Sequence, residues 1–219
     1  MEELYLVKRN WYCWLCCISL FVLIACNEKS DNPNFNNCSC LDFALYQEVA
    51  DSTKYQWFPN GWMGAINSIT CDVKCNESPH SGSSSIKITY DPNNSVKWAG
   101  IFWLNNNMWN GPGVNVYSTY QTCDTCNIKV TFWCHGEMGG EKMQFKVGGV
   151  TDGGDSMNQP VETSWLTLTN SWSKYEIDIT GKDLSNLVGG FCWVIDNSHN
   201  STTEIITIYI DDIIYEATN

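Results

Sequence analysis

Apolar and polar residues alternate through much of the chain, most clearly in the stretch from Ile128 to Gly149. In 128–135, Ile, Val, Phe and Cys occupy one set of alternate positions, and Lys, Thr, Trp and His occupy the other. Residues 142–147 repeat this pattern. A period of two is typical of a strand with one buried face. Because the glycine-rich segment 136–140 tolerates a chain reversal, the pattern predicts a β-hairpin with one apolar face toward a core.

Further short strands are expected on both sides of this stretch. The segments that predict them are 84–90, 98–104, 165–169, 174–179, 189–195 and 205–215. Asn, Gly, Pro and Asp are common between these segments, as expected for turns. No run of ten or more residues has the 3.6-residue period of an amphipathic helix. The fold class that this favours is all-β, an antiparallel β-sandwich or jelly roll.

Composition narrows the functional classes. The chain has 219 residues and a formal net charge of −12, with 16% charged residues, 13% aromatic residues and eleven Trp. Disordered chains are poor in aromatic residues, so we expect a folded domain. An acidic chain whose Lys and Arg residues do not cluster has no electrostatic reason to bind nucleic acid. We therefore expect no nucleic-acid partner.

The beginning of the chain is typical of an export signal. Lys8 and Arg9 precede an apolar run, Trp11–Ala25, whose 15 residues are fewer than the ~20 that a transmembrane helix needs. The run ends in Leu-Ile-Ala-Cys26, and a polar stretch follows. This arrangement resembles the lipobox of bacterial lipoproteins, in which the cysteine carries the lipid. An uncleaved membrane anchor is the alternative.

These features predict three parts. Residues 1–25 would be a lipoprotein signal peptide, 26–40 a lipidated N-terminus with a polar tether, and 41–219 a single β-jelly-roll domain. Lipid attached at Cys26 would hold the protein to a membrane, because each buried methylene contributes ~0.8 kcal/mol. We therefore expect a lipid-anchored protein of the outer membrane or cell surface.

Eight cysteines follow Cys26, and an even number in an exported protein favours disulfides. The local pairs Cys71–Cys75 and Cys123–Cys126 are the simplest expectation. Two mid-strand residues, Cys134 and Cys192, are expected close together across the core, bridged or as thiols. A redox Cys-x-x-Cys motif is an alternative for 123–126, although no thioredoxin-like βαβ pattern surrounds it. A four-cysteine zinc site is another, although the spacings are unusual for one.

Several short motifs occur in an order that resembles the β-jelly-roll carbohydrate-binding modules of the galactose-binding-like fold. They are Trp98-Ala-Gly-Ile-Phe-Trp103, Phe132-Trp133-x-x-Gly136, Gly139-Gly-Glu141, Phe145-Lys-Val-Gly-Gly149, Gly189-Gly-Phe191 and Ile208-Tyr-Ile-Asp-Asp-Ile213. The resemblance covers residues 58–216. It implies a non-catalytic domain that binds a polysaccharide or oligosaccharide, with other glycan-utilisation proteins as possible partners.

The resemblance also implies a structural calcium ion. Asp211 or Asp212 would then lie near Ser81-Gly82 and an early acidic residue, either Glu48 or Asp51. Carboxylate and carbonyl oxygens are the ligands that calcium prefers. The alternative is that Asp211-Asp212 ends a strand and hydrogen-bonds a loop.

The polar face of the expected hairpin supplies the candidate ligand contacts. Trp133 and His135 would lie on its first strand, and Gln144 and Lys146 opposite them on the second. Sugars lay C–H faces on aromatic rings while flanking polar groups bind their hydroxyls. Further candidate rings are Trp103, Trp109 and Trp62. Packing inside the sandwich is the alternative for each ring, because most of the nine Trp after Cys26 are expected in the core.

Enzymatic activity is the main alternative function. The sequence has no Gly-x-Ser-x-Gly elbow, no Walker or Rossmann glycine pattern, and no His pair with metal-ligand spacing. Glycosidases need two carboxylates ~5–9 Å apart, and loop residues Glu137, Glu141, Asp152 and Asp155 are the ones that offer a pair. Carboxylates in loops are more often solvated turn residues. A glycan-degrading jelly-roll enzyme, lyase or hydrolase, and a protein–protein adhesion module are therefore kept as alternatives.

Overall fold

The structure, a computed structural model, describes residues 38–48, 56–105 and 109–219. The chain divides into two units, Met1–Phe35 and Asn36–Asn219, and every described residue belongs to the second. Cys26 and Asp51 lie outside the described residues. Within the described part, no helix has the length and apolar character needed to cross a membrane.

Nearly all regular structure is β-strand, and the sandwich predicted from the sequence is confirmed. The strands are β1 Phe43–Tyr46, β2 Phe58–Gly64, β3 Ile69–Cys75, β4 Ser85–Tyr90, β5 Trp98–Leu104, β6 Asn127–Gly136, β7 Lys142–Val147, β8 Val161–Glu162, β9 Leu166–Thr167, β10 Ser173–Asp178, β11 Gly189–Asp196 and β12 Ile206–Thr218. Among the described residues, the helical elements are short: α1 Val116–Tyr120 and the 3-10 turns Ile66–Ser68 and Thr151–Gly153.

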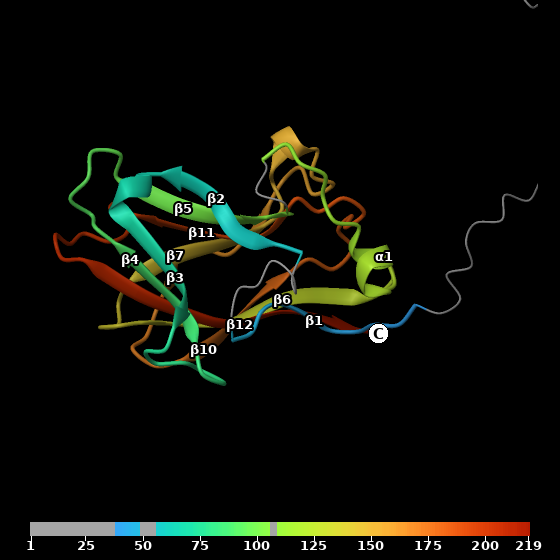
Figure 1. The fold of residues 1–219 in the computed structure, drawn as a ribbon, viewed down its shortest axis with the longest axis horizontal. Helices are drawn as coiled ribbons and strands as arrows, with labels where there is room; N and C mark the ends of the chain where they lie inside the picture. Colours follow the sequence, from blue (N-terminus) through green and yellow to red (C-terminus); the bar gives the residue numbers. More distant parts are fainter. Residues whose placement is uncertain (1–37, 49–55, 106–108) are drawn as a thin grey trace, which may run out of the picture. The chain divides into compact units, whose positions relative to one another are not determined.

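The strands form two six-stranded sheets with antiparallel pairing. Sheet A has the order β10-β6-β12-β4-β3, with β1 also paired to β12. Sheet B has the order β2-β5-β11-β7-β8, with β9 also paired to β7. Figure 1 shows β2, β5 and β11 in one layer and β1, β6, β10 and β12 in the other.

The predicted hairpin of β6 and β7 is wrong, because the two strands belong to different sheets. β6 pairs with β10 and β12, whereas β7 pairs with β11, β8 and β9. Their apolar faces instead meet across the core, where the ring centroids of Phe132 and Phe145 are 4.4 Å apart. Alternation shows which residues face a core, and it holds equally for paired strands and for strands in opposite layers.

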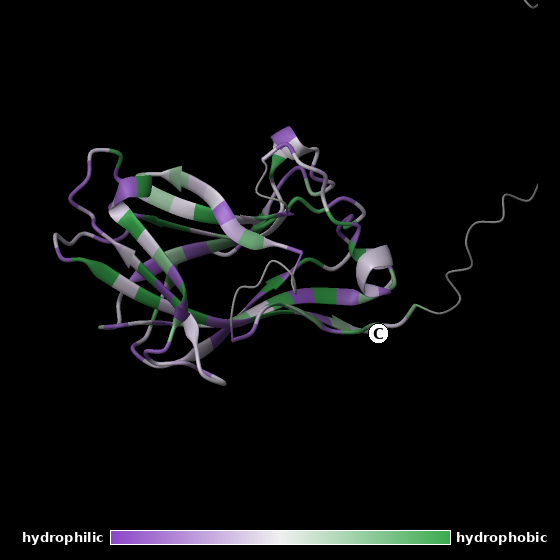
Figure 2. Ribbon diagram, in the orientation of Figure 1, coloured by the Kyte–Doolittle hydropathy of each residue, from purple (hydrophilic) through white to green (hydrophobic). Residues whose placement is uncertain are grey.

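The core between the sheets is built from alternate residues of nearly every long strand. Trp57, Trp103 and Trp193 are its largest residues, each 1% exposed. The buried hydroxyl of Tyr215 donates to the carbonyl oxygen of Gly190 at 2.6 Å, so this polar atom is satisfied. Figure 2 shows the alternation as bands of opposite hydropathy along the strands.

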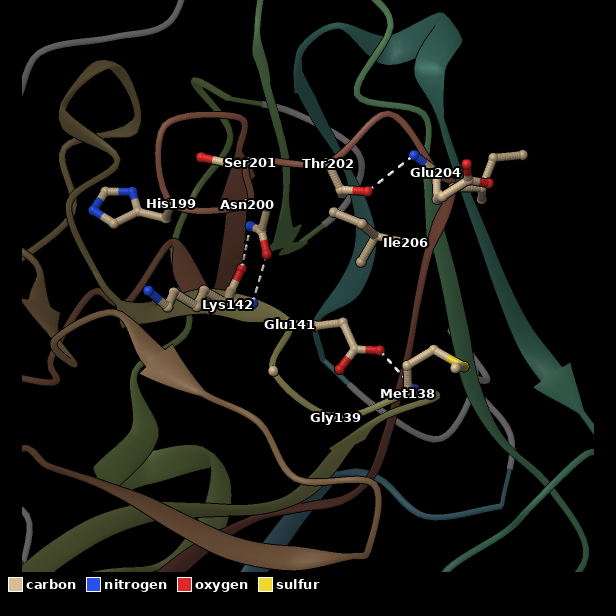
Figure 3. Close-up of a pocket in the computed structure, with 12 residues that line it drawn as sticks. Met138, Gly139, Glu141, Lys142, His199, Asn200, Ser201, Thr202, Glu204 and Ile206 are labelled. Atoms are coloured by element: carbon tan, nitrogen blue, oxygen red, sulfur yellow. Dashed lines mark hydrogen bonds between the residues drawn. The ribbon is translucent and has the colours of Figure 1, made fainter.

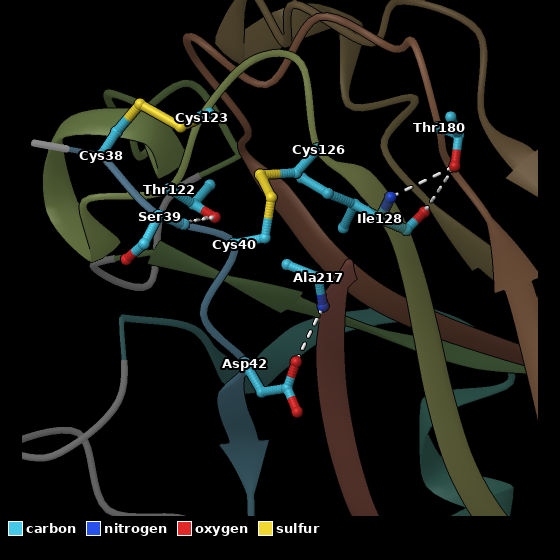
Figure 4. Close-up of a disulfide and its surroundings, with 10 residues drawn as sticks. All are labelled: Cys38, Ser39, Cys40, Asp42, Thr122, Cys123, Cys126, Ile128, Thr180 and Ala217. Atoms are coloured by element: carbon cyan, nitrogen blue, oxygen red, sulfur yellow. Dashed lines mark hydrogen bonds between the residues drawn. A yellow bond between two sulfur atoms is a disulfide. The ribbon is translucent and has the colours of Figure 1, made fainter. Parts of the chain in front are cut away.

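Two disulfides fasten the start of the described chain to the segment between α1 and β6. They join Cys38 to Cys123 and Cys40 to Cys126, with Cα–Cα distances of 5.3 and 5.7 Å. Figure 4 shows the two bonds in one view with Ala217 of β12, whose N–H donates to Asp42 Oδ1 at 2.8 Å. The predicted pair Cys123–Cys126 is therefore wrong, because the fold brings together cysteines that are 85 and 86 residues apart. The predicted pair Cys71–Cys75 is also wrong, because both residues remain thiols.

Four cysteines of the described domain remain thiols: Cys71, Cys75, Cys134 and Cys192. Cys134 points into the core between the sheets, whereas Cys192 lies on the opposite side of sheet B with Phe102 and Val188. The expectation that Cys134 and Cys192 are neighbours is therefore wrong. It failed because β11 is apolar on both faces, so its sequence does not show which face is inside.

Candidate functional site

The outer face of sheet A carries the two predicted site residues of β6, but other rings cover them. The imidazole of His80 stacks on the Trp133 indole with centroids 3.9 Å apart. His135 is only 6% exposed, stacks on Tyr209 at 4.8 Å and meets Trp172 edge to face at 4.5 Å. Each ring of this aromatic cluster is therefore covered by a neighbouring ring, and a ligand would have to displace one ring to stack on another.

The segment that covers Trp133 is held by carboxylates of the central strand β12. The N–H groups of His80 and Ser81 donate to Asp211 Oδ2 at 2.9 and 3.3 Å. Asp212 accepts the Ser81 hydroxyl at 2.9 Å and lies 2.8 Å from His80 Nδ1. A bulge in β12 between Asp211 and Ile214, with a positive φ at Asp212, turns both carboxylates toward this segment. Burial raises the pKa of the Asp211 carboxyl group.

These contacts also test how well the residues would suit calcium. Glu48 reaches the same segment, where its Oε2 accepts the N–H and hydroxyl of Ser83, both at 2.9 Å. The groups facing these three carboxylates are thus N–H and O–H donors rather than the six to eight oxygens of a calcium site. Within residues 38–48, 56–105 and 109–219, no cluster of three acidic, His or Cys side chains suits a metal. The donor set does not fit the ion, and calcium stays a prediction from the resemblance alone.

The other two predicted residues of the site, Gln144 and Lys146, lie on the outer face of sheet B. They are separated from Trp133 and His135 by the whole thickness of the sandwich, so the four cannot form one platform. Gln144 Nε2 donates to the Thr163 carbonyl oxygen at 2.9 Å. Lys146 forms an ion pair with Glu162 at 2.7 Å. Both polar groups are therefore fixed along one margin of this face.

The middle of the outer face of sheet B is apolar, and it stands little above the backbone of the sheet. Phe102, Cys192 and Lys146 form one cross-strand row, and Gly100, Val194 and Gln144 form the next. A Cβ on Gly100 would lie 2.6 Å from the Trp193 carbonyl oxygen, so no side chain can rise at that point. Met63 and Val194 pack beside it and form a small second apolar cluster with Phe102 and Cys192.

Two partly exposed indoles stand at the ends of this apolar surface. Trp98, at the start of β5, is 39% exposed, and the absence of a Cβ on Gly64 leaves room for its ring. Trp109 is 37% exposed and meets Phe102 edge to face at 5.6 Å. Phe102 lies four residue steps beyond Trp98 along β5, which is ~13 Å at ~3.3 Å per residue. We refer to the surface of Trp98, Gly100, Val194, Gln144 and Trp109 as the B face.

The remaining predicted rings fall elsewhere. Trp103 is 1% exposed and packs edge to face on Tyr46 and Phe191, so it belongs to the core and not to a surface platform. Trp62 is 39% exposed, but it lies on the side of Ile101 at the edge strand β2 and not over the B face. Only Trp109, Gln144 and Lys146 among the predicted residues lie on or beside the B face.

Trp98 was missing from the residues predicted for a site. A signal for it exists in the sequence, because Trp98 and Trp103 are five positions apart and must point to opposite faces of one strand. Only one of them can therefore line the core. Choosing between them requires knowing which alternate residues of β5 face the core. A strand that is apolar at every position does not show this.

Comparisons with solved structures show the same fold. A family 30 carbohydrate-binding module aligns with a TM-score of 0.52 and 13% identity, covering 81% of this chain and 99% of its own. The family 11 carbohydrate-binding module of a cellulosomal cellulase of Clostridium thermocellum gives 0.51 and 10%, covering 82% and 96%. An agarase gives 0.50 and 8%, covering 81% of this chain but 25% of the agarase. Neither protein-family models nor curated proteins yield a match.

Proposed function

We propose that this protein is a non-catalytic glycan-binding module whose B face binds a polysaccharide or oligosaccharide. The observation that carries the proposal is the B face itself, where two exposed indoles flank a low apolar surface with polar groups along its margin. A sugar ring presents flat C–H faces and hydroxyl edges, and this combination suits aromatic rings bordered by hydrogen-bonding groups.

The geometry matches an extended ligand better than a compact one. The surface follows β5 for ~13 Å between Trp98 and the Phe102–Trp109 pair. Gln144, Lys146 and Glu162 lie along one side of this path, where they offer an amide, an ammonium and a carboxylate to hydroxyl groups. The carbohydrate-binding modules that share the fold support this choice of ligand class.

Catalysis has no comparable support from the described residues. The two carboxylates beside the B face are both engaged, Glu162 with Lys146 at 2.7 Å and Asp196 with His199 at 2.9 Å. Asp155, considered earlier for a catalytic pair, is 4% exposed and accepts backbone N–H groups of Met157 and Gly189. A pair of unengaged carboxylates facing one sugar, as glycosidases require, is not formed by these groups.

The proposal also includes the location of the protein in the cell. The apolar run that ends at Cys26 supports a lipid anchor at the outer membrane or cell surface. A polar tether would then separate the anchor from the disulfide-bonded start of the domain. A glycan-binding domain held in this way would bring polysaccharide to the cell and to neighbouring glycan-utilisation proteins.

Affinity electrophoresis of Asn36–Asn219 in gels containing different polysaccharides tests the B face. Trp98→Ala should weaken retention roughly 30-fold, because truncating an aromatic anchor usually costs ~2 kcal/mol of binding free energy. Trp62→Ala is the matched control, because Trp62 is equally exposed at 39% but lies off the face. Melting temperatures of both variants should stay close to that of the parent.

The same gels separate the alternatives. Retention lost in Trp62→Ala but kept in Trp98→Ala would move the site to the edge of β2. Shortening of the polysaccharide during incubation would establish an enzyme. A folded, monodisperse domain that no polysaccharide retards would overturn glycan binding and favour protein–protein adhesion.

A further inference from the structure

The turn that follows β11 carries a histidine beside the Trp98 end of the B face. Asp196, the last residue of β11, points outward like Val194 and is the cross-strand partner of Trp98. Its carboxylate accepts the His199 backbone N–H at 2.9 Å and lies 2.9 and 3.1 Å from His199 Nδ1. The hydroxyl group of Ser198 donates to the same carboxylate at 3.0 Å. These bonds hold the His199 side chain next to Asp196.

A stacking contact fixes the plane of the His199 ring. The ring stacks on the Trp165 indole, with centroids 3.9 Å apart and an interplanar angle of 14°. Trp165 directly precedes Leu166 of β9, which pairs with β7 and packs against the core. Because neighbouring residues of an extended chain alternate, the Trp165 side chain lies on the outer side of sheet B. The stack therefore lies on the β7 side of Asp196, whereas Trp98 lies on the β5 side.

The backbone of this turn is also anchored to the sheet. Asn200 is 5% exposed, its Oδ1 accepts the Lys142 N–H at 2.7 Å, and its Nδ2 donates to the Lys142 carbonyl oxygen at 2.8 Å. Figure 3 shows both bonds, with the His199 ring extending away from them. Asn200 Nδ2 also donates to the Asp196 carbonyl oxygen at 3.0 Å. His199 is thus held in place before a ligand arrives, which lowers the cost of ordering it on binding.

One nitrogen of the His199 ring is left for a ligand. The hydrogen bonds between this ring and the described residues all involve Nδ1, and the side chain is 36% exposed. In a neutral imidazole, the nitrogen that faces a carboxylate carries the proton and the other nitrogen is an acceptor. With Nδ1 donating to Asp196, Nε2 therefore presents a lone pair. A sugar hydroxyl, which can donate its O–H, suits this acceptor.

The same acceptor restricts the charge of the ligand. A carboxylate or sulfate group has no proton to donate to Nε2, and Asp196 places a negative charge beside the ring. The net charge of −12 further disfavours an anionic polysaccharide. Lys146 on this face is already paired with Glu162 at 2.7 Å. The ammonium group of Lys142 can donate to a hydroxyl oxygen as well as to a carboxylate, so an uncharged glycan meets all of these conditions.

We propose that His199 is a specificity-determining contact of the B face, where its Nε2 accepts a hydroxyl group of a neutral sugar residue beside Trp98. This inference rests on the proposed glycan-binding function and deepens it. It adds a contact from the β11–β12 connection and specifies an uncharged ligand.

Affinity gels of Asn36–Asn219 at mildly alkaline pH, where imidazole is neutral, test the class of ligand. Barley β-glucan, xyloglucan, galactomannan and arabinoxylan are the neutral probes, and alginate and polygalacturonate are the acidic probes. At least one neutral probe should retard the parent protein, and neither acidic probe should. Retention on an acidic probe in place of the neutral ones would overturn the assignment of an uncharged ligand.

Two substitutions of His199 test the contact itself. His199→Asn keeps a donor for Asp196 but has no atom at the Nε2 position, so retention should weaken about three- to tenfold, as expected for one lost neutral hydrogen bond. His199→Gln places its amide near the Nε2 position and should keep more of the retention than His199→Asn. Both variants lose the stack on Trp165, so comparing them isolates the Nε2 position. Ser198→Ala, in the same turn, is the matched control and should bind like the parent.

Nitrogen NMR gives a readout that a purely structural role would not change. Fragments of whichever neutral polysaccharide retards the parent should shift the Nε2 signal of His199 and leave its Nδ1 signal nearly unchanged. An unchanged Nε2 signal in the presence of bound fragments would overturn the contact.

The inference and the proposed function fail in different ways. If His199→Asn binds like the parent, or His199→Gln loses as much retention as His199→Asn, the contact is overturned while Trp98-dependent retention leaves the B face in place. If none of the six polysaccharides retards the parent, the proposed function fails and the contact fails with it.

Discussion

Removing the two disulfides should reveal a strong coupling between them. We consider Cys38→Ala with Cys123→Ala, Cys40→Ala with Cys126→Ala, and the combination of both pairs. Either disulfide alone closes a loop of 85 or 86 residues in the unfolded chain. In the chain-entropy description, such a loop stabilises the fold by about 4.6 kcal/mol.

The second disulfide adds much less than the first. With Cys38–Cys123 formed, the bond between Cys40 and Cys126 closes a ring of only about seven residues, for which the same relation gives about 2.4 kcal/mol. Each pair of substitutions should therefore cost about 2.4 kcal/mol, but the combination should cost about 7 kcal/mol. The excess of about 2 kcal/mol over the sum is the coupling free energy.

Urea unfolding followed by tryptophan fluorescence under non-oxidising, thiol-free conditions measures these differences. The parent protein in reductant is the control, because it should match the four-substitution variant. Additive losses, with the combination equal to the sum of the two pairs, would refute the shared-loop reasoning. Such a result would show that each disulfide acts by local packing around α1 instead.

Three further outcomes are expected. Cys26→Ser should release the protein from membranes or block its processing, and a variant that stays in the lipid fraction at full length would contradict the lipobox prediction. EDTA and added calcium should both leave the melting temperature unchanged, because N–H and O–H donors already bind the carboxylates of Asp211 and Asp212. A higher melting temperature with calcium would instead support the calcium site that the resemblance implies. Trp133→Ala should lower the free energy of unfolding by about 1–3 kcal/mol, through loss of its stacking on His80, while polysaccharide retention is kept; lost retention at unchanged stability would return the site to sheet A.

The sequence was sufficient for the class of fold and for most of the longer strands, but it did not predict β1, β2 or β3. Alternation in 128–135 and in 142–147 correctly placed Phe132, Phe145 and Val147 in the core. It did not identify partners, because a strand with one apolar face can pair beside its neighbour or face it across a sandwich. The predicted platform failed at that step, since Trp133 and Gln144 lie on opposite outer surfaces.

The disulfides and the site could not be predicted in full, because they depend on contacts between residues far apart in the sequence. Spacing favoured the bond Cys123–Cys126, but the fold places Cys38 and Cys40 against those residues. To predict the B face, one must know which residues of β5 point outward, and the sequence does not show this because both faces of β5 are apolar.

The position of β12 determines when the domain can fold. This 13-residue strand pairs with β1, β4 and β6, and so it joins the parts of sheet A that are made earlier. Phe43 has Tyr215 as its cross-strand partner, which means that a ribosome must finish residue 215 before this register exists. A nascent chain that lacks β12 is left with an incomplete sheet and no closed core. It should therefore stay unfolded during synthesis, and this is the state in which a polypeptide can be threaded through a narrow export channel before it folds on the far side.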